Sequence, residues 1–369
     1  MTKRIIICGG GVIGGSVAYH LAKAGAEVTI VEKDGIAAGA SGGAAGLLSR
    51  PSVTNRTPLY ELQKLGFSMH LELSKTLPEE AGFGYDFAFS SRAHIATNIL
   101  EKQDLENLID EYQKSQLDAE WLSAETLQET SDWIDGERIL GAAVLPGSAS
   151  VDAYRYTLAL YTATERMGGI VKSGEVTKLI HADRQIQAVE VGSQRIEADT
   201  VLIAMGPWSK MLENDISQPI PVQPLKGQIL KLRPENPVKM YGFNYDGNYC
   251  VAKNPEVIVA GTTEENAGFD TGITRSARDQ ILEFALNFSA YLENAELIEQ
   301  TACLRPLSQD GLPLMGEVES IQGLYIATGH GRQGILLSPS SGLAMSELIL
   351  TGKSTSVDLA AFDPNRFAR

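Results

Sequence analysis

The first glycine-rich turn constrains the fold of this chain more than any other feature. Its glycines have the spacing Gly-x-Gly-x-x-Gly: Gly9, Gly11 and Gly14. An apolar run at residues 5–8 precedes the turn, and residues 16–25 follow it with apolar side chains near helical spacing. A second apolar run at residues 28–31 ends at Glu32. This order predicts a strand, a turn, a helix and a parallel strand, which is the arrangement of a dinucleotide-binding unit.

Each part of the turn has a physical task in such a unit. Gly9 permits a tight turn, Gly11 lets the backbone approach a pyrophosphate, and Gly14 lets the helix pack closely on the strand. The helix N-terminus, at Val12 and Ile13, supplies free N–H groups and positive potential. We therefore expect this turn to hold the phosphates of a dinucleotide.

Glu32 narrows the choice of dinucleotide. A carboxylate at the end of the second strand accepts hydrogen bonds from ribose hydroxyls and repels a 2′-phosphate, so it disfavours NADP. The alternative interpretation is a glycine-rich turn in an unrelated α/β protein.

The segment after Glu32 favours FAD over NAD. An NAD enzyme usually continues into another helix and strand, whereas residues 35–46 are small and have almost no bulk. Such a segment cannot build its own core, but it can lie flat against a long ligand, with backbone N–H groups and Ser41 reaching phosphate and ring atoms. A flexible linker is the alternative, which the apolar Leu47 and Leu48 disfavour.

These motifs resemble the FAD-dependent D-amino acid oxidase superfamily, particularly its glycine oxidase and sarcosine oxidase branch. Further matching segments are residues 144–152, 204–209, 226–228, 304–306, 310–313 and 329–336. The resemblance implies FAD as the cofactor and the following contacts with it: Gly9, Gly11, Val12, Ile13, Gly14, Glu32, Lys33, Ala40, Ser41, Ala45, Gly46, Leu47, Val176, Gly206, Trp208, Gly329, His330, Gly331, Arg332, Gln333, Gly334 and Ile335.

The fold class expected is α/β, with a Rossmann-like FAD-binding domain and an inserted antiparallel-sheet (α+β) substrate domain. Proline and glycine punctuate alternating residues across 219–263, which favours antiparallel strands. We assign residues 1–84, 143–217 and 305–369 to the FAD-binding domain, and residues 85–142 and 218–304 to the substrate domain. Helices are predicted at residues 59–75, 101–115, 151–167 and 275–291, and strands at 170–171, 176–180, 188–191 and 201–204.

A second strand–turn–helix lies near the end of the chain. An apolar run at residues 324–328 precedes the turn Gly329–Gly334, and a helix is predicted from Ile335. The resemblance implies that this helix N-terminus faces the pyrimidine end of the flavin ring, where its N–H groups stabilise the negative charge of the reduced ring. His330 is a candidate base, but its glycine neighbours favour a hydrogen-bonded turn histidine.

Three residues are the candidates for catalysis. Arg305 lies between Leu304 and Pro306, where an arginine is either a buried ion-pair partner or a two-pronged clamp for a carboxylate. The resemblance favours the clamp. It also matches Tyr249 to an active-site tyrosine that assists the same carboxylate, the alternative being an ordinary strand tyrosine. Arg332 is the third candidate, near the flavin ring.

Cys303 raises the question of covalent attachment. By resemblance, a cysteine two residues before an active-site position is tethered to the flavin in the sarcosine oxidase branch, whereas glycine stands there in the glycine oxidase branch. We favour a small buried thiol and non-covalent FAD, with a link through Cys303 as the alternative. The three cysteines are too few and too scattered for a disulfide framework or a CxxC metal site.

The resemblance implies oxidative deamination of a small amino acid: glycine, sarcosine or another N-alkyl glycine, or a D-amino acid. Hydride would pass from Cα to flavin N5, giving an oxo acid, an amine and, with oxygen as electron acceptor, hydrogen peroxide. One alternative is a dehydrogenase of the same fold that reduces a quinone or an electron-transfer protein. A flavin-binding subunit that needs a partner chain and an NAD-linked dehydrogenase are the others.

Charge and composition limit the partners of the chain. A net charge of −15 disfavours nucleic acid and anionic lipid surfaces. The first apolar run is too short for a signal peptide, and no uninterrupted apolar stretch approaches the roughly 18 residues of a membrane span. We expect a cytoplasmic protein, and the sequence leaves open whether it forms a homo-oligomer.

Overall fold

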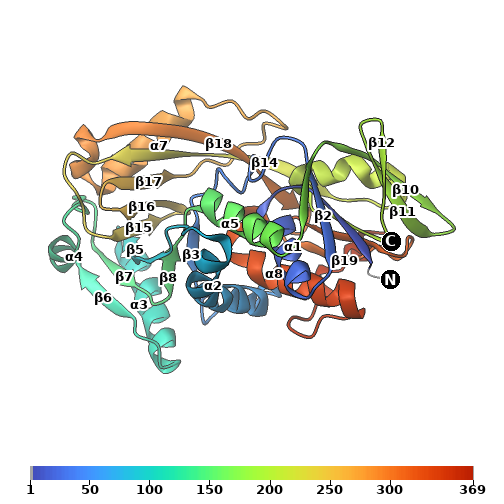
Figure 1. The fold of residues 1–369 in the computed structure, drawn as a ribbon. Helices are drawn as coiled ribbons and strands as arrows, with labels where there is room; N and C mark the ends of the chain where they lie inside the picture. Colours follow the sequence, from blue (N-terminus) through green and yellow to red (C-terminus); the bar gives the residue numbers. More distant parts are fainter. Residues whose placement is uncertain (1–2, 369) are drawn as a thin grey trace.

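A six-stranded sheet with mainly parallel pairing forms one half of the computed structural model, which describes residues 3–368 (Figure 1). Neighbouring strands are parallel except at the edge pair β19–β20. In order across the sheet the strands are β19 (Leu314–Glu317), β20 (Leu324–Thr328), β13 (Thr200–Ile203), β1 (Arg4–Cys8), β2 (Glu27–Glu32) and β9 (Ile170–Ser173). The predicted βαβ unit at the start of the chain is confirmed.

Different layers cover the two faces of this sheet. Ile5 and Ile7 of β1 pack with the helices, while Ile6 and Cys8 pack toward the other face, so β1 is buried on both sides. This burial explains its continuous apolar run. The helices of the first face are α1 (Val12–Lys23), α2 (Leu59–Ala81), α5 (Ala153–Arg166) and α8 (Gly334–Thr351). The other face carries the antiparallel strands β10 (Val176–Ala182), β11 (Gln185–Val191) and β12 (Gln194–Glu197), with η1 (Gly206–Leu212) and α6 (Glu213–Ile216).

Helix α8 lies in the core between its neighbours. Residues Gly331–Thr351 are long and apolar enough to cross a membrane by length and composition, but 67% of the tested window is buried inside the structure. Gly342 of α8 packs against Ser16 of α1, and an added Cβ there would overlap Ser16 Oγ and lie 2.7 Å from the Ser16 carbonyl carbon. The apolar character of α8 therefore reflects its packing against α1, α2 and the sheet.

A second, eight-stranded sheet forms the other half of the molecule (Figure 1). Its pairs are antiparallel except β15 with β5, as the punctuated alternation of residues 219–263 predicts. In order its strands are β18 (Glu296–Ser308), β14 (Val222–Arg233), β17 (Val257–Gly261), β16 (Asn248–Asn254), β15 (Tyr241–Tyr245), β5 (Ser91–Ala96), β7 (Gly141–Val144) and β6 (Glu120–Ser123).

Trp133 and Phe243 lie at the centre of the core under this second sheet. Helix α7 (Arg275–Phe288) closes it with Ile281, Ala285 and Phe288. The remaining elements are α3 (Ile99–Lys114), α4 (Ala124–Thr130), η2 (Ala290–Asn294), η3 (Gly331–Gln333), η4 (Ala360–Phe362), η5 (Pro364–Phe367) and a small sheet of β3 (Leu47–Ser49), β8 (Ser148–Ser150) and β4 (Ala88–Phe89). The predicted domain boundaries stay a prediction.

Two predicted helix ends are wrong. Helix α2 continues to Ala81 through Pro78 instead of ending near residue 75. Leu77 and Ala81 are buried in the core beneath it, so tertiary packing outweighs the local cost of an internal proline. Helix α7 ends at Phe288, and the chain to residue 291 turns into η2.

The crossing of α1 and α8 yields a stability prediction. Gly342→Val should lower the free energy of unfolding by about 1–3 kcal/mol, because its side chain would push apart two helices that are in contact. The midpoint of denaturant unfolding measures the effect. Leu350→Val, at an exposed position of the same helix, is the matched control and should change stability by less than about 0.5 kcal/mol. Equal stability of the two variants would contradict the tight crossing.

Candidate active site

A cavity of about 770 Å³ opens at the carboxyl ends of the parallel strands. Cys8, Glu32 and Thr328 line it from the ends of β1, β2 and β20. The N-termini of α1 and α8 also reach it, at Val12 and Gly334. In open α/β sheets this edge is where ligands bind. The two sequence motifs that are more than 300 residues apart therefore meet at one site.

Hydrogen bonds hold the first glycine turn in place from several directions. The Gly10 N–H donates to Glu32 Oε2 at 2.5 Å, and the Tyr161 hydroxyl donates to the carbonyls of Gly9 and Gly11 at 3.2 and 3.0 Å. Gly11 is the N-cap of α1 and provides no side-chain cap. The turn is thus fixed without a bulky group in front of the helix N-terminus.

The small-residue segment after β2 is hydrogen-bonded to this turn, and its predicted contact with the cofactor stays a prediction. The Val12 N–H donates to Ser41 Oγ at 2.9 Å, and the Ala37 N–H donates to the Gly10 carbonyl at 2.9 Å. Residues 35–46 form no helix or strand, and β3 begins at Leu47. This part of the chain contributes these residues to the cavity wall: Ala38, Gly39, Ala40, Ser41, Gly43, Ala44, Ala45, Gly46 and Leu47.

Most residues predicted to contact FAD line the cavity, and three do not. Gly14 is behind the wall, where an added Cβ would lie 2.5 Å from the Gly9 carbonyl oxygen, in keeping with its predicted role in packing. Gly329 lies against Ser308 and Leu314, and the Gln333 amide oxygen accepts a hydrogen bond from Gln63 at 2.6 Å. The predicted residues that line the cavity are Gly9, Gly11, Val12, Ile13, Glu32, Lys33, Ala40, Ser41, Ala45, Gly46, Leu47, Val176, Gly206, Trp208, His330, Gly331, Arg332, Gly334 and Ile335.

An aromatic and cationic stack borders one part of the cavity. The Lys33 ammonium lies 5.5 Å from the centroid of the Trp208 ring. The centroid of the Phe269 ring lies 5.5 Å from that of Trp208. All three residues line the cavity, and Lys33 is also 3.4 Å from Glu175 Oε1. Phe269 was not predicted, because no local pattern distinguishes an aromatic in this loop from a core residue.

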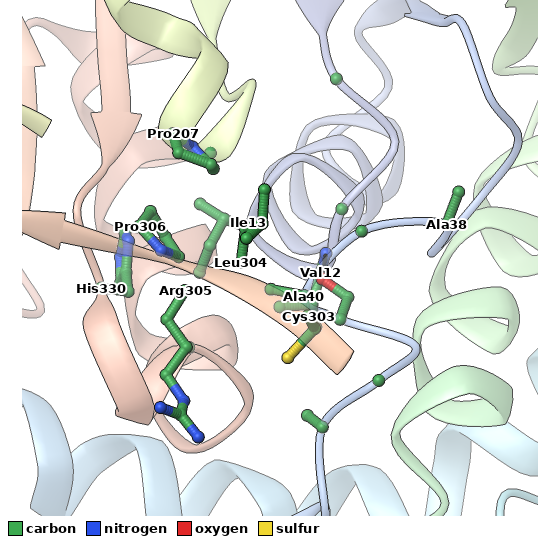
Figure 2. A pocket seen from close by; sticks show the side chains of 18 of the residues that line it. Val12, Ile13, Ala38, Ala40, Pro207, Cys303, Leu304, Arg305, Pro306 and His330 are labelled. Carbon is green, nitrogen blue, oxygen red and sulfur yellow. Dashed lines mark hydrogen bonds between the residues drawn. The ribbon is translucent and has the colours of Figure 1, made fainter. Parts of the chain in front are cut away.

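Arg305 extends from β18 toward the pocket (Figure 2). Its side chain is held by neutral acceptors, since Nη2 donates to Thr262 Oγ1 at 2.6 Å and Nη1 donates to the Thr263 carbonyl at 3.1 Å. The residue is only 9% exposed. Its one carboxylate contact among residues 3–368 is Glu264 Oε1, at 3.9 Å from Nη1. A buried guanidinium with so little negative charge around it is suited to an incoming carboxylate.

Tyr249 and Arg332 lie with Arg305 on the wall of the same cavity. Burial raises the pKa of the Tyr249 hydroxyl to about 12, so the phenol stays protonated and can donate a hydrogen bond near neutral pH. Arg332 Nη2 donates to the Gly247 carbonyl at 3.1 Å, and Nε lies 3.4 Å from Glu264 Oε1. The structure therefore brings all three candidate catalytic residues together.

His330 and Cys303 are both poorly suited to ionise here. Burial lowers the pKa of His330 to about 3, and its Nε2 lies 3.1 Å from Ser341 Oγ, so it is a neutral turn histidine. Burial raises the pKa of the Cys303 thiol. Cys303 lines the cavity beside Gly43, where an added Cβ would lie 2.9 Å from Cys303 Cβ.

Lys253 supports the small-residue segment from behind. Its Nζ donates to the carbonyls of Ala45 and Val151 at 2.8 and 2.7 Å, which ties the segment to the chain just before α5. Burial lowers the pKa of Lys253 to about 7. The sequence contains no signal for this role, because a lysine in an alternating strand is expected to face solvent.

Comparison with known proteins decides the family. Residues 4–348 match the family described as FAD dependent oxidoreductase. The chain belongs to that family. It is 30% identical to glycine oxidase of Geobacillus kaustophilus over 99% of this chain and 98% of that protein. Solved glycine oxidase structures from Geobacillus kaustophilus and Bacillus cereus superpose with TM-scores of 0.92 and 0.89, at 29% and 32% identity, covering 99% and 96% of both chains.

FAD is therefore the cofactor of this oxidoreductase, and the residues present fit it. The cavity is long enough to join two helix N-termini, small side chains line the path between them, and Glu32 lies where a ribose would be bound. Arg305 and Arg332 also line the cavity, and Arg332 Nε lies 3.4 Å from Glu264 Oε1.

Gly227 makes room for the Arg305 side chain. An added Cβ at Gly227 would overlap the guanidinium, so Gly227→Ala should displace it and raise KM for a carboxylate substrate by about tenfold or more, as expected when a charge-assisted contact is lost. Steady-state kinetics with FAD content measured in parallel tests this. Gly84→Ala is the control, because no atom lies within 4 Å of a Cβ there. An unchanged KM in Gly227→Ala would contradict the packing argument.

Lys253 should affect FAD affinity from outside the cavity. Lys253→Met leaves two carbonyls without their donor, so the dissociation constant of FAD should rise by about tenfold, whereas Lys253→Arg keeps the charge and the donors. Wild-type affinity should also fall as pH rises through about 7, where the ammonium loses its proton, and Lys253→Arg should not show this fall. Titration of the apoprotein with FAD measures both effects; equal affinities for the Met and wild-type proteins would refute the role.

Proposed function

We propose that this enzyme catalyses the oxidative deamination of a small amino acid, namely glycine, sarcosine or another N-alkyl glycine, or a D-amino acid. The products would be an oxo acid, an amine and hydrogen peroxide. The observation that carries the proposal is Arg305, a buried guanidinium held by neutral acceptors on the wall of the FAD cavity. The similarity to proteins named glycine oxidase supports the same substrate class.

In this proposal the substrate carboxylate binds Arg305 through two parallel hydrogen bonds and Tyr249 through its protonated hydroxyl. Fixing the carboxylate at two points orients the Cα–H bond of the substrate, and such positioning supplies most of the rate enhancement. FAD, when bound, accepts the hydride that leaves Cα. An amine that binds in its neutral form needs no protein base. We therefore assign no base role to His330, whose pKa is lowered by burial.

The α8 N-terminus has an electrostatic part in the reaction. Gly334 and Ile335 present the first turn of α8 to the cavity, and the side chain of the N-cap residue Gln333 makes no capping hydrogen bond. Its N–H groups favour negative charge on a group bound in front of them. The α8 N-terminus would stabilise negative charge on the bound cofactor, while Arg305 beside it would hold the substrate carboxylate.

The space for the substrate is limited by cavity-lining residues that include Tyr249, Thr262 and Leu304. Non-covalent FAD, beside a protonated Cys303, also belongs to the proposal, as does a cytoplasmic location. Self-association into a homo-oligomer stays a prediction. Direct reduction of oxygen is preferred to transfer to a quinone or a partner chain, because the full-length relatives are named oxidases.

Anaerobic bleaching of the bound flavin tests the proposed function. Glycine, sarcosine and D-amino acids should each be mixed with the holoenzyme, and at least one should remove the absorbance of oxidised FAD. Readmitting oxygen should restore the colour and release hydrogen peroxide. Matched carboxylates without the amine, such as acetate, are the controls and should not bleach it. If no amino acid or secondary amine bleaches the flavin, the proposal is wrong; rapid bleaching with slow reoxidation by oxygen favours the dehydrogenase alternative.

A further inference from the structure

Glu264 places one protein carboxylate between the two arginines of the site. Its Oε1 lies 3.4 Å from Arg332 Nε and 3.9 Å from Arg305 Nη1. The arginines come from different elements, Arg305 from β18 and Arg332 from η3, and both line the cavity. Within residues 3–368, neither guanidinium has another carboxylate within 4 Å. Glu264 was not a candidate from the sequence, since acidic residues in a loop are usually solvated.

The backbone on both sides of Glu264 is anchored. The Thr263 carbonyl accepts from Arg305, and the Thr263 N–H donates to the Gln228 carbonyl at 3.3 Å. On the other side, the N–H and carbonyl of Glu265 pair with those of Lys226 at 2.9 and 3.0 Å. Although the Glu264 side chain is 47% exposed, its attachment point is held beside the arginines.

Arg305, Arg332 and Glu264 therefore form a group with two positive charges and one negative charge. Tyr249 stays neutral because burial raises the pKa of its hydroxyl, and His330 stays neutral because burial lowers its pKa. The other acceptors of the guanidinium groups are a threonine hydroxyl and backbone carbonyls. One substrate carboxylate completes the charge balance, whereas a second would meet Glu264.

We propose that Glu264 is a specificity-determining residue that occupies Arg332 and restricts the enzyme to amines with a single carboxylate. Arg332 is the nearer partner of Glu264, so Arg305 remains for the substrate. The second carboxylate of a dicarboxylic amine would have to bind Arg332, which is already paired with Glu264. It would also be repelled by the negative charge of Glu264, so the enzyme would select against it by repulsion. This inference rests on the proposed function and adds the substrate class that the site rejects.

The test compares wild type with Glu264→Gln, which keeps the shape and removes the charge. Sarcosine and iminodiacetate are the substrates, because both are N-substituted glycines and only the second carries two carboxylates. The ratio of kcat/KM for iminodiacetate to that for sarcosine should rise about two- to fivefold in the variant, the range expected for a partly exposed charge pair. The gain should shrink at high salt.

Binding without turnover separates this inference from the proposed function. Acetate and malonate are unreactive ligands with one and two carboxylates, and calorimetric titration of the FAD-loaded protein gives their affinities. Glu264→Gln should improve malonate binding relative to acetate by about the same two- to fivefold. This comparison holds even if no amine bleaches the flavin, so the two proposals fail separately.

Glu256→Gln is the matched control, because it removes the same charge from the exposed turn between β16 and β17. It should leave both ratios at the wild-type value. Glu264→Met, with normal FAD content, provides a second variant should the glutamine disturb the loop. Unchanged ratios in the Glu264 variants would overturn the inference. An equal gain for ligands with one and with two carboxylates would overturn it too, as would a failure of both acetate and malonate to bind.

Discussion

The close crossing of α1 and α8 determines where the rest of the site can lie. Each helix follows a parallel strand, so its N-terminus points to the carboxyl edge of the same sheet. Contact between Ser16 and Gly342 brings the two helices together without intervening side chains. The distance between the two helix ends is thereby fixed by packing of the protein core. One long cofactor, with a central pyrophosphate and with a flavin at one end that becomes negative on reduction, can then contact both helix ends.

An acidic protein can bind an anionic cofactor and an anionic substrate because its positive potential is local. The net charge of the chain is −15, yet the cavity contains two helix N-termini and the side chains of Arg305 and Arg332. Helix ends act within about one turn and are little affected by charges far across the surface. The overall charge instead discourages polyanions, which would need a continuous basic surface.

The amino-acid sequence predicts those parts of the site that depend on local backbone form. The turn at Gly9, the acidic residue at Glu32 and the second glycine turn before Ile335 each have a spacing that only a few structures satisfy, and the βαβ unit follows from the first two. The antiparallel strands follow instead from the alternation and Pro/Gly punctuation of residues 219–263. Contacts made across the fold leave no such pattern. Gly227 and Lys253 are far from their partners in sequence, and the continuation of α2 through Pro78 depends on the core below it.

The surroundings of Arg305 suit the carboxylate recognition that we propose for it. A buried guanidinium is costly to desolvate, and here its hydrogen-bond partners, Thr262 Oγ1 and the Thr263 carbonyl, are neutral. They satisfy some of its donors and fix the plane of the group, but they do not offset its charge. A carboxylate that enters the cavity provides that offset in a dry environment, where a charge-assisted pair is strongest. Lysine would not serve equally, since its rotating ammonium cannot keep two acceptors in the protein and still present two parallel N–H groups to the substrate.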